Sequence, residues 1–358
     1  MDEIIAWLSQ LIDFDTTAAG PDAEECVLFI RQALSSRGAL VRTFVTEGGA
    51  RTGHHLLAEI PGDRPDAVML HAHLDTADFG EGEDWLFPAD HASRRRGCVC
   101  GRGALDCKGP LAVWMKLISD AAAGGPRAYT LRLLVSDLEE SGGENGLGRL
   151  LEQHPEVLSD VRLVIGEGGG FPFPFHEHVY YTLQTGERET EPDLFGDAED
   201  PGWERAAEIL SMGVEKGYYS PALLDYAREA PSLPGRRLDI RPLYDGMEAF
   251  FAHAPVSHVC ARFSQAFEAA LRRELPNARL MPCITPGYSD NRWFRKAGIP
   301  TAGFFPLDIR NSLAGIHGAN EYISEASLAL AYRTVSRALE AVSPEQLPHT
   351  MEKPLRSL

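Results

Sequence analysis

An apolar run that ends in a cluster of polar side chains places the strongest constraint on how this chain can fold. The stretch A-V-M-L-H-A-H-L-D-T carries His71, His73 and Asp75, and a buried strand would turn all three toward one face at its carboxyl end. After a loop, G-R-G-A-L-D-C-K-G-P sets Asp106 among glycines, which let a ligand approach the backbone closely. Histidine and carboxylate ligands together suit Zn²⁺, with Asp75 placed to orient the His73 imidazole. Ordinary hydrogen bonds that close a buried strand are the competing explanation for the two histidines.

Helical and strand-like segments alternate along the chain. Apolar residues recur at helical spacing in 4–12, 23–37, 110–123, 144–153, 259–275 and 324–341. Apolar runs typical of strands occupy 40–45, 56–60, 67–74, 129–135, 161–165, 180–186, 280–284 and 298–306. Apolar strands separated by helices predict an α/β fold with a mixed, mostly parallel twisted sheet and helices on both faces.

Acidic residues follow two further apolar strands. Glu139 and Glu140 come after 129–135, and Glu167 comes after 161–165. Two adjacent carboxylates repel each other unless they share a cation or a proton. Because ligands of open α/β sheets gather outside the carboxyl ends of the strands, these acids can converge with the earlier side chains. The set that can converge is His73, Asp106, Glu139, Glu140 and Glu167.

The order of these motifs resembles that of a known family of hydrolases. H-x-D is followed by G-R-G-x-x-D-x-K-G, then E-E-x-G-G, a single acid, and the late histidine of G-I-H-G-A-N-E. This order is similar to that of the di-zinc hydrolases that include aminoacylase, acetylornithine deacetylase, succinyl-diaminopimelate desuccinylase and glutamate carboxypeptidase. The resemblance covers residues 1–186 and 256–345 and implies a zinc-peptidase-like catalytic domain.

The resemblance implies a pair of Zn²⁺ ions, for which Co²⁺ or Mn²⁺ can substitute. Asp106 is implied to bridge the two ions. His73 and Glu167 complete one metal site, and Glu140 and His317 complete the other.

The resemblance also assigns roles in catalysis and substrate binding. Glu139 takes the role of general base, next to a water that the metals activate. Arg292, in T-P-G-Y-S-D-N-R-W-F, is implied to bind a free carboxylate of the substrate, for which its planar fork is suited. Asn291 stands where the family usually has a small residue, which alters the same pocket. The peptide bond between Asp106 and Cys107 is expected to be cis.

These features predict a zinc-dependent peptidase or amidohydrolase that acts on an N-acyl amino acid or a small peptide. Two alternatives keep the same ligands. A rebuilt site could carry out amide formation or acyl transfer in a biosynthetic pathway, by excluding water in favour of an amine. A non-catalytic metal-binding scaffold is the second alternative, although a scaffold does not need a base such as Glu139 beside its ligands.

Residues 187–255 interrupt the resemblance and are expected to form a reduced, rebuilt lid between catalytic segments 1–186 and 256–358. Family members carry a dimerising lid there, with a Gly-His-x-Ser motif that reaches the partner's site, and this interval has no such motif. The acidic stretch 187–204 predicts a mobile loop. The remainder predicts helices at 203–214, 221–230 and 246–252 and one strand at 237–243. We therefore expect a site completed within one chain, in a monomer or in a dimer not made through the usual lid.

Two short segments have distinctive local sequences. The alternating F-P-F-P-F of residues 171–175 predicts a rigid apolar loop, which either forms a wall of the substrate pocket or packs beneath the lid. The consecutive Arg94, Arg95 and Arg96 predict a solvated hairpin tip.

The net charge argues against some classes of binding partner, and the cysteines indicate where in the cell the protein is expected. The 34 Lys and Arg against 52 Asp and Glu leave a net charge of -18, which argues against nucleic acid or an anionic membrane surface as partner. The six cysteines show no C-x-x-C pair and no disulfide-framework spacing, as expected of reduced thiols in a cytosol. Residues 1–10 include acids where a signal peptide would have basic residues, and no apolar run reaches membrane-spanning length. A cytoplasmic protein is expected.

Overall fold

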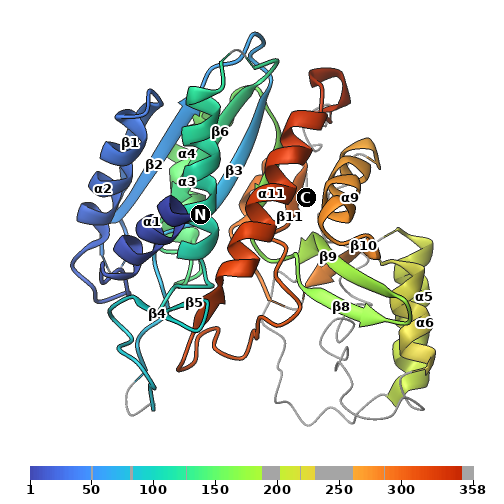
Figure 1. Ribbon diagram of the computed structural model, residues 1–358. Helices are drawn as coiled ribbons and strands as arrows, with labels where there is room; N and C mark the ends of the chain where they lie inside the picture. Colours follow the sequence, from blue (N-terminus) through green and yellow to red (C-terminus); the bar gives the residue numbers. More distant parts are fainter. Residues whose placement is uncertain are drawn as a thin grey trace.

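The structure is a computed structural model that describes residues 1–49, 51–80, 84–125, 127–187, 202–217, 219–229, 261–285 and 287–348. In these residues a nine-stranded sheet runs in the order β1-β2-β6-β3-β7-β11-β9-β10, with β8 paired to β9 (Figure 1). The strands are β1 (Leu40–Thr46), β2 (Gly53–Ile60), β3 (Ala67–His73), β6 (Thr130–Ser136), β7 (Val161–Gly166), β8 (Pro172–Phe175), β9 (His178–Glu187), β10 (Ala278–Thr285) and β11 (Thr301–Gly303).

The central strands of this sheet are parallel. The neighbours β6, β3, β7 and β11 run parallel to one another, as do β9 and β10. Antiparallel pairs add β1 and β2 at one side, β8 at the other, and the contact between β11 and β9. The predicted α/β class with a mixed, mostly parallel sheet is confirmed.

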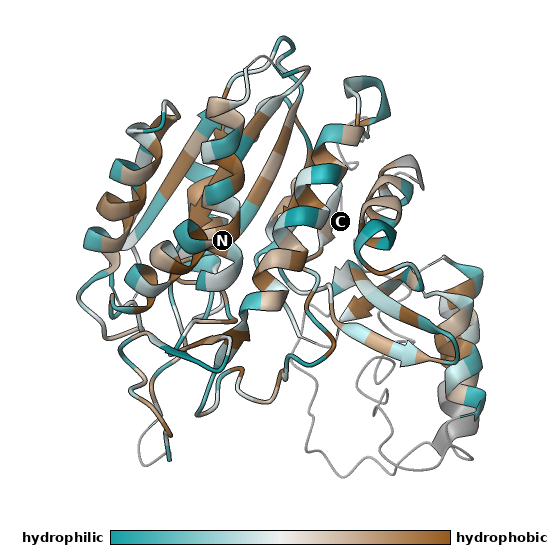
Figure 2. Ribbon diagram, in the orientation of Figure 1, coloured by the Kyte–Doolittle hydropathy of each residue, from teal (hydrophilic) through white to brown (hydrophobic). Residues whose placement is uncertain are grey.

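Helices cover both faces of the sheet. The first face is covered by α1 (Asp2–Ile12), α2 (Ala23–Ser35), α3 (Lys108–Ala123), α9 (Ala261–Glu274) and α11 (Glu325–Ala341), and the second by α4 (Arg149–Gln153) and α10 (Asn291–Lys296). In β3, Val68 and Leu70 pack on the first face and Met69 on the second. Because both faces are covered, the central strands are apolar along most of their length, as Figure 2 shows.

A second sheet links two loops that carry predicted ligands. Its strands are β4 (Ser93–Arg95), β5 (Cys98–Cys100) and β12 (Tyr322–Ser324). β4 and β5 form the hairpin predicted for the arginine run, and the Arg94 side chain is exposed and pairs with Glu325. Tyr322 of β12 pairs with Cys100 of β5, so the segment after His317 is tied to the segment before Asp106.

Three predicted segments differ from the structure. Residues 172–175 form strand β8 instead of a loop, and their two prolines are compatible with this because an edge strand needs only every second N–H for pairing. The helix predicted at 144–153 is divided into a π-type turn (Glu144–Gly148) and α4, since Gly146 has non-helical angles (φ -93°, ψ -113°). The strand predicted at 298–306 is reduced to β11.

A side lobe consists of β8, α5 (Gly202–Glu215) and α6 (Pro221–Glu229), which pack against β9 and β10 (Figure 1). Its apolar core is separate from the two that flank the sheet and includes Phe173, Leu223 and Tyr226. The helices predicted at 203–214 and 221–230 are confirmed as α5 and α6.

Much of the predicted lid lies outside the described residues. This holds for the strand predicted at 237–243, the helix predicted at 246–252 and most of the acidic stretch 187–204. Glu187 itself is described, and it is the buried last residue of β9 instead of a loop residue. Within the described ranges, no helix is both long and apolar enough to cross a bilayer.

Candidate metal centre and active site

The predicted ligands meet at the carboxyl edge of the sheet. His73 is the last residue of β3, Glu167 directly follows β7, and Glu140 lies shortly beyond β6. Asp106 precedes α3, and His317 lies in the loop before β12. Because parallel strands end at one edge, residues far apart in the sequence come within reach of one another there. The peptide bond that follows Asp106 is cis, so that prediction is confirmed.

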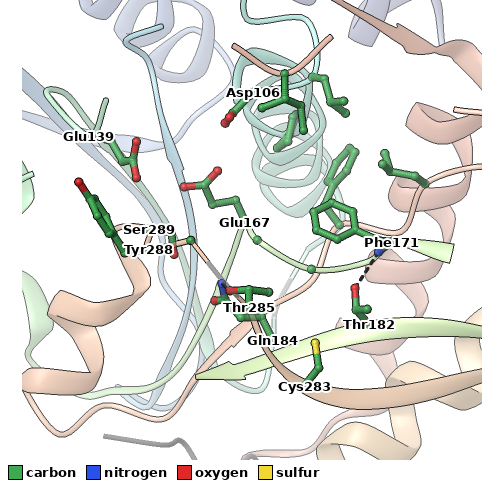
Figure 3. Close-up of a pocket in the computed structure, with 18 of the residues that line it drawn as sticks. Asp106, Glu139, Glu167, Phe171, Thr182, Gln184, Cys283, Thr285, Tyr288 and Ser289 are labelled. Carbon is green, nitrogen blue, oxygen red and sulfur yellow. Dashed lines mark hydrogen bonds between the residues drawn. The ribbon is translucent and has the colours of Figure 1, made fainter. Parts of the chain in front are cut away.

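Asp106 lies between two histidines. His73 Nε2 is 3.1 Å from Asp106 Oδ1 and 3.5 Å from Glu167 Oε2. His317 Nε2 is 3.3 Å from Asp106 Oδ2 and 3.1 Å from Glu140 Oε2. Asp106 thus offers one oxygen to each histidine. Figure 3 shows the carboxylates of Asp106 and Glu167 directed into the same space. These contacts bring together the residues that the resemblance implied as ligands, and their division between two metal sites stays a prediction.

The donor set fits divalent metal ions. The ligand atoms of Asp106, Glu140 and His317 lie within 4.8 Å of one another, and the same holds for a group that includes His73, Asp106 and Glu167. Glu140 Oε1 is buried and has no hydrogen-bond partner among the described residues. Several partly buried carboxylates this close together repel one another unless positive charge balances them. Imidazole and carboxylate are both zinc ligands, so a cation at this place would satisfy both the charge and the unpaired oxygen.

The pKa values of His73, His317 and Glu167 also indicate that positive charge is favourable at this site. Burial lowers the pKa of His73, yet the Glu167 carboxylate and the hydrogen bond with Asp106 raise it well above its ordinary value. Hydrogen bonds with Asp106 and Glu140 raise the pKa of His317 to about 10. Burial raises the pKa of Glu167 to about 7. The carboxylates around both imidazoles thus favour positive charge at this place, which a metal cation would supply.

Glu139 borders the cavity that Asp106 and Glu167 also line. In Figure 3 its carboxylate faces the same space as theirs. Burial raises the pKa of Glu139 well above its usual range, and Glu167 adds to this, although His73 opposes it. A carboxyl group with a raised pKa accepts a proton more readily and can then donate it again. This is the chemistry expected of the general base that the resemblance assigned.

Asp75 connects two of the ligands from behind. His73 Nδ1 lies 2.9 Å from the Asp75 carbonyl oxygen and 3.5 Å from its carboxylate. The backbone N–H of Glu140 donates to Asp75 Oδ2 at 3.0 Å. Burial would raise the pKa of Asp75, but the His73 contact holds it below its ordinary value. A charged Asp75 can therefore orient the imidazole of one ligand and the backbone of another.

Glu321 holds the loop that carries Asp106, and this role was not predicted. Its Oε1 accepts the backbone N–H of Leu105 at 2.8 Å and of Asp106 at 3.0 Å. Its Oε2 accepts the N–H of Gly103 at 2.9 Å and a guanidinium nitrogen of Arg102 at 3.1 Å. Because Glu321 follows the late histidine in the same loop, it ties the two ligand loops together. A glutamate in G-I-H-G-A-N-E carries no sequence signal for binding backbone amides.

A second buried carboxylate holds the turn that carries Glu139 and Glu140. Asp137 Oδ2 and Oδ1 accept from the two guanidinium nitrogens of Arg51, at 2.6 Å and 2.7 Å. Asp137 Oδ2 also accepts the backbone N–H of His54 at 2.9 Å. The pair joins the loop between β1 and β2 to the end of β6, and neither residue was predicted to support the site.

Arg292 and Asn291 lie behind the wall of the cavity. Arg292 is buried and donates to the Gly142 carbonyl oxygen and, at 3.1 Å, to Glu144 Oε1. Asn291 Nδ2 donates to the Glu167 carbonyl oxygen at 2.9 Å. Neither side chain is among the described residues that line the cavity. The predicted contact of Arg292 with a substrate carboxylate stays a prediction.

Comparison with known proteins identifies the family. Residues 69–341, well over half of the chain, match the model of peptidase family M20/M25/M40. The chain belongs to this family. The family predicted from the motifs is confirmed, and membership of the M20 family agrees with the predicted class of enzyme.

Individual M20 relatives share only part of the sequence. The chain is 28% identical over 172 residues to the cysteinylglycine-S-conjugate dipeptidase of Corynebacterium striatum, covering 47% of this chain and 37% of that protein. It is 33% identical over 115 residues to a probable succinyl-diaminopimelate desuccinylase of Staphylococcus epidermidis, covering 32% and 27%. The matched part thus spans about a third of the length of these relatives. The fold resembles that of the M20 family metallo-carboxypeptidase Sso-CP2 from Sulfolobus solfataricus, with a TM-score of 0.66 and 15% identity over 95% of this chain and 99% of that one.

Proposed function

We propose that this protein hydrolyses an amide or peptide bond in an N-acyl amino acid or a short peptide. The observation that carries the proposal is the position of Asp106 between two imidazole–carboxylate groups, with Glu139 bordering the same cavity. The names of the two relatives, a dipeptidase and a desuccinylase, support this class of substrate.

The proposed site would hold a pair of Zn²⁺ ions, with Co²⁺ or Mn²⁺ as substitutes. Asp106 would bridge them, His73 and Glu167 would hold one, and Glu140 and His317 would hold the other. Such ions supply Lewis acidity and lower the pKa of water so that hydroxide is available near neutral pH. The protein's part is to keep the ligands in place, through the buried contacts of residues such as Asp75.

Glu139 would move the proton. It would accept a proton from the attacking water and later deliver it to the nitrogen of the leaving amine. Its raised pKa makes the carboxylate a stronger base, which suits the first of these steps.

The test is the Glu139→Gln variant, which keeps the size of the side chain and removes its basicity. We expect turnover to fall at least ~10²-fold while metal content and thermal stability are kept, because only proton transfer is lost. Turnover would be measured with a panel of N-acyl amino acids and dipeptides after a metal assay of the purified protein. Glu152→Gln, at an exposed position in α4, is the matched control and should leave turnover unchanged. Full turnover by Glu139→Gln would remove Glu139 from the mechanism.

The remaining parts of the functional assignment rest on the sequence. We propose that the substrate has a free carboxylate, that the site is complete within one chain, and that the protein is cytoplasmic. The absence of Gly-His-x-Ser from 187–255 supports the second point, and the five free cysteines of the described ranges support the third. Mixing Glu139→Gln with a variant shortened within 187–255 tests the single-chain site. Activity recovered in the mixture would show that the site is shared between chains.

A further inference from the structure

We propose that the cavity beside the metal ligands binds a large apolar group of the substrate, an aliphatic or aromatic side chain or acyl group attached next to the scissile bond. The inference rests on the proposed function, because it assigns the substrate class of that same site.

The cavity has a volume of about 480 Å³ and is apolar on one side. Ligand pockets of this size are typical of sites for small molecules. The apolar wall is formed by Leu105, Pro110, Phe171, Phe305, Leu307 and Ile316. Figure 3 shows that Asp106, Glu139 and Glu167 lie at one end of the cavity, with Phe171 and Thr182 at the other.

The apolar wall starts at the ligands themselves. Leu105 is the neighbour of Asp106 in the chain, and Ile316 is the neighbour of His317, and all four residues line the cavity. A group that packs on Leu105 and Ile316 therefore lies directly beside the proposed metal centre. The bond attached to that group would be the one presented to Glu139.

Phe171 and Ile316 are the residues of the apolar wall that remain only partly buried. Phe305 and Leu307 are already buried at 4% and 1% exposure, whereas Phe171 is only partly buried. The backbone N–H of Phe171 donates to Thr182 Oγ1 at 2.9 Å, which fixes the position of the residue at the cavity (Figure 3). Covering the exposed part of this ring with an apolar group removes apolar surface from water, which is favourable.

Several polar side chains on the other side of the cavity form hydrogen bonds within the protein. Gln184 Nε2 donates to Thr285 Oγ1 at 2.7 Å, and Gln184 Oε1 accepts from Arg295 at 3.0 Å. Ser289 Oγ donates to the buried carboxylate of Glu187 at 2.6 Å. Gln184 and Ser289 use these donor and acceptor groups within the protein, so pairing the same groups with a charged substrate group would break existing bonds. An uncharged, apolar group fits the cavity without that cost.

The test is a dipeptide panel in which one residue at a time is Ala, Leu, Phe or Glu. We expect kcat/KM to rise at least ~10-fold from Ala to Leu or Phe on one side of the scissile bond, since each methylene in an apolar pocket is worth about 10-fold or more. Glu at that position should be poorer than Ala. Wild-type protein alone gives this result, so it does not depend on the folding of any variant. Equal kcat/KM for Ala, Leu and Phe on both sides would overturn the proposal.

The Phe171→Ala variant tests whether the preference for Leu and Phe arises in this cavity. It should remove most of the preference for Leu and Phe over Ala in kcat/KM. Phe44→Ala is the matched control, because Phe44 is a partly buried phenylalanine in β1 at the far side of the sheet. The control should keep the preference. An equal loss for all substrates in Phe171→Ala would place the preference elsewhere and overturn the assignment to this wall.

Binding to Glu139→Gln separates this inference from the proposed function. Calorimetric titration of that variant with the same dipeptides measures affinity without turnover, and Leu or Phe should bind at least ~10-fold more tightly than Ala. If wild-type protein cleaves no substrate but the binding preference holds, the hydrolytic function fails and the apolar pocket stands. If cleavage occurs without any preference in rate or binding, the pocket assignment fails and the function stands.

Discussion

The ligand edge of the sheet and the side lobe are stabilised by different kinds of contact. At the ligand edge, the buried carboxylates of Glu321 and Asp137 accept hydrogen bonds from backbone amides and from arginines. In the side lobe, α5 and α6 pack on β8 mainly through apolar and aromatic side chains. The rings of Phe173 and Tyr226 pack edge to face, with 4.7 Å between their centroids. The ligand edge therefore contains buried charges, whereas the side lobe has an ordinary apolar core.

This difference follows from what each region has to hold. Hydrogen bonds are directional, whereas burial of apolar surface is not. Ligands of a metal ion must be fixed to within about 0.5 Å, so directional contacts are useful at such a site even though burying charge is costly. The side lobe only has to remain attached to β9 and β10. The contrast predicts that changes at the ligand edge alter the metal site, and changes in the lobe alter local stability.

The largest effect is expected from Asp106→Asn. A neutral amide cannot bridge two dications, so the variant should lose metal and lose turnover by about 10³-fold or more, the equivalent of several kcal/mol. Metal content per chain, measured by elemental analysis after gel filtration, checks this. Asp63→Asn, at an exposed position, should keep its metal. Two metals per chain in Asp106→Asn would contradict the bridging role.

A smaller effect is expected from Glu321→Gln. In either orientation the amide nitrogen of the new side chain faces donors that Glu321 accepts from, such as the N–H groups of Leu105 and Asp106 or of Gly103. The Asp106 loop should loosen, and metal affinity should fall ~10- to 100-fold, as for other residues that support ligands. Competition with a chelator measures the affinity.

The control for Glu321→Gln is Glu325→Gln. Glu325 pairs with Arg94 at 2.6 Å, with the arginine side chain 57% exposed, so the change should have little effect. If both variants bind metal as tightly as the unchanged protein, Glu321 has no part in holding the site.

The sheet and the cluster of side chains at its carboxyl edge could be predicted because their signals are local. Each ligand follows an apolar run or lies in a glycine-rich motif, and an apolar run of this length with helices on both sides indicates a buried parallel strand. His73 and Glu167 can therefore be located from a few neighbouring residues. The resemblance to a known family then gave each of them a role.

The supporting residues could not be predicted because their contacts are distant and have no characteristic residue type. Glu321 binds backbone amides about 215 positions earlier, and Arg51 binds Asp137 across 86 positions. Any acid can accept from an amide, so no spacing identifies such a pair. Strand β8 was missed for a different reason: its prolines are typical of loops, and only the partner strand β9 makes it an edge strand.

Arg51→Lys should reduce turnover more than metal binding. Lysine keeps the charge beside Asp137 but cannot supply both nitrogens of the planar fork, so the turn that carries Glu139 should become less well fixed. We expect kcat to fall about 10-fold with metal content unchanged, because a small displacement of a catalytic group has a large effect on rate. Arg132→Lys, which alters the Glu59 pair in the sheet, should not change kcat. Unchanged kcat in both variants would show that the Arg51 fork does not position Glu139.

The smallest effect on the metal site is expected from Leu223→Ala in the side lobe. Leu223 is fully buried in the core of the lobe, so its truncation should cost ~2–5 kcal/mol there. Leu70→Ala removes the same group from β3, next to the strand end that supplies His73, and is the matched comparison. If the lobe is stabilised independently, Leu223→Ala should increase proteolysis and hydrogen exchange in α5 and α6 alone, since separate cores can open separately. Leu70→Ala should instead lower the stability of the whole sheet together with metal affinity. Equal loss of metal affinity in the two variants would mean that the lobe and the ligand edge form one cooperative unit, and that the contrast between them is only one of contact type.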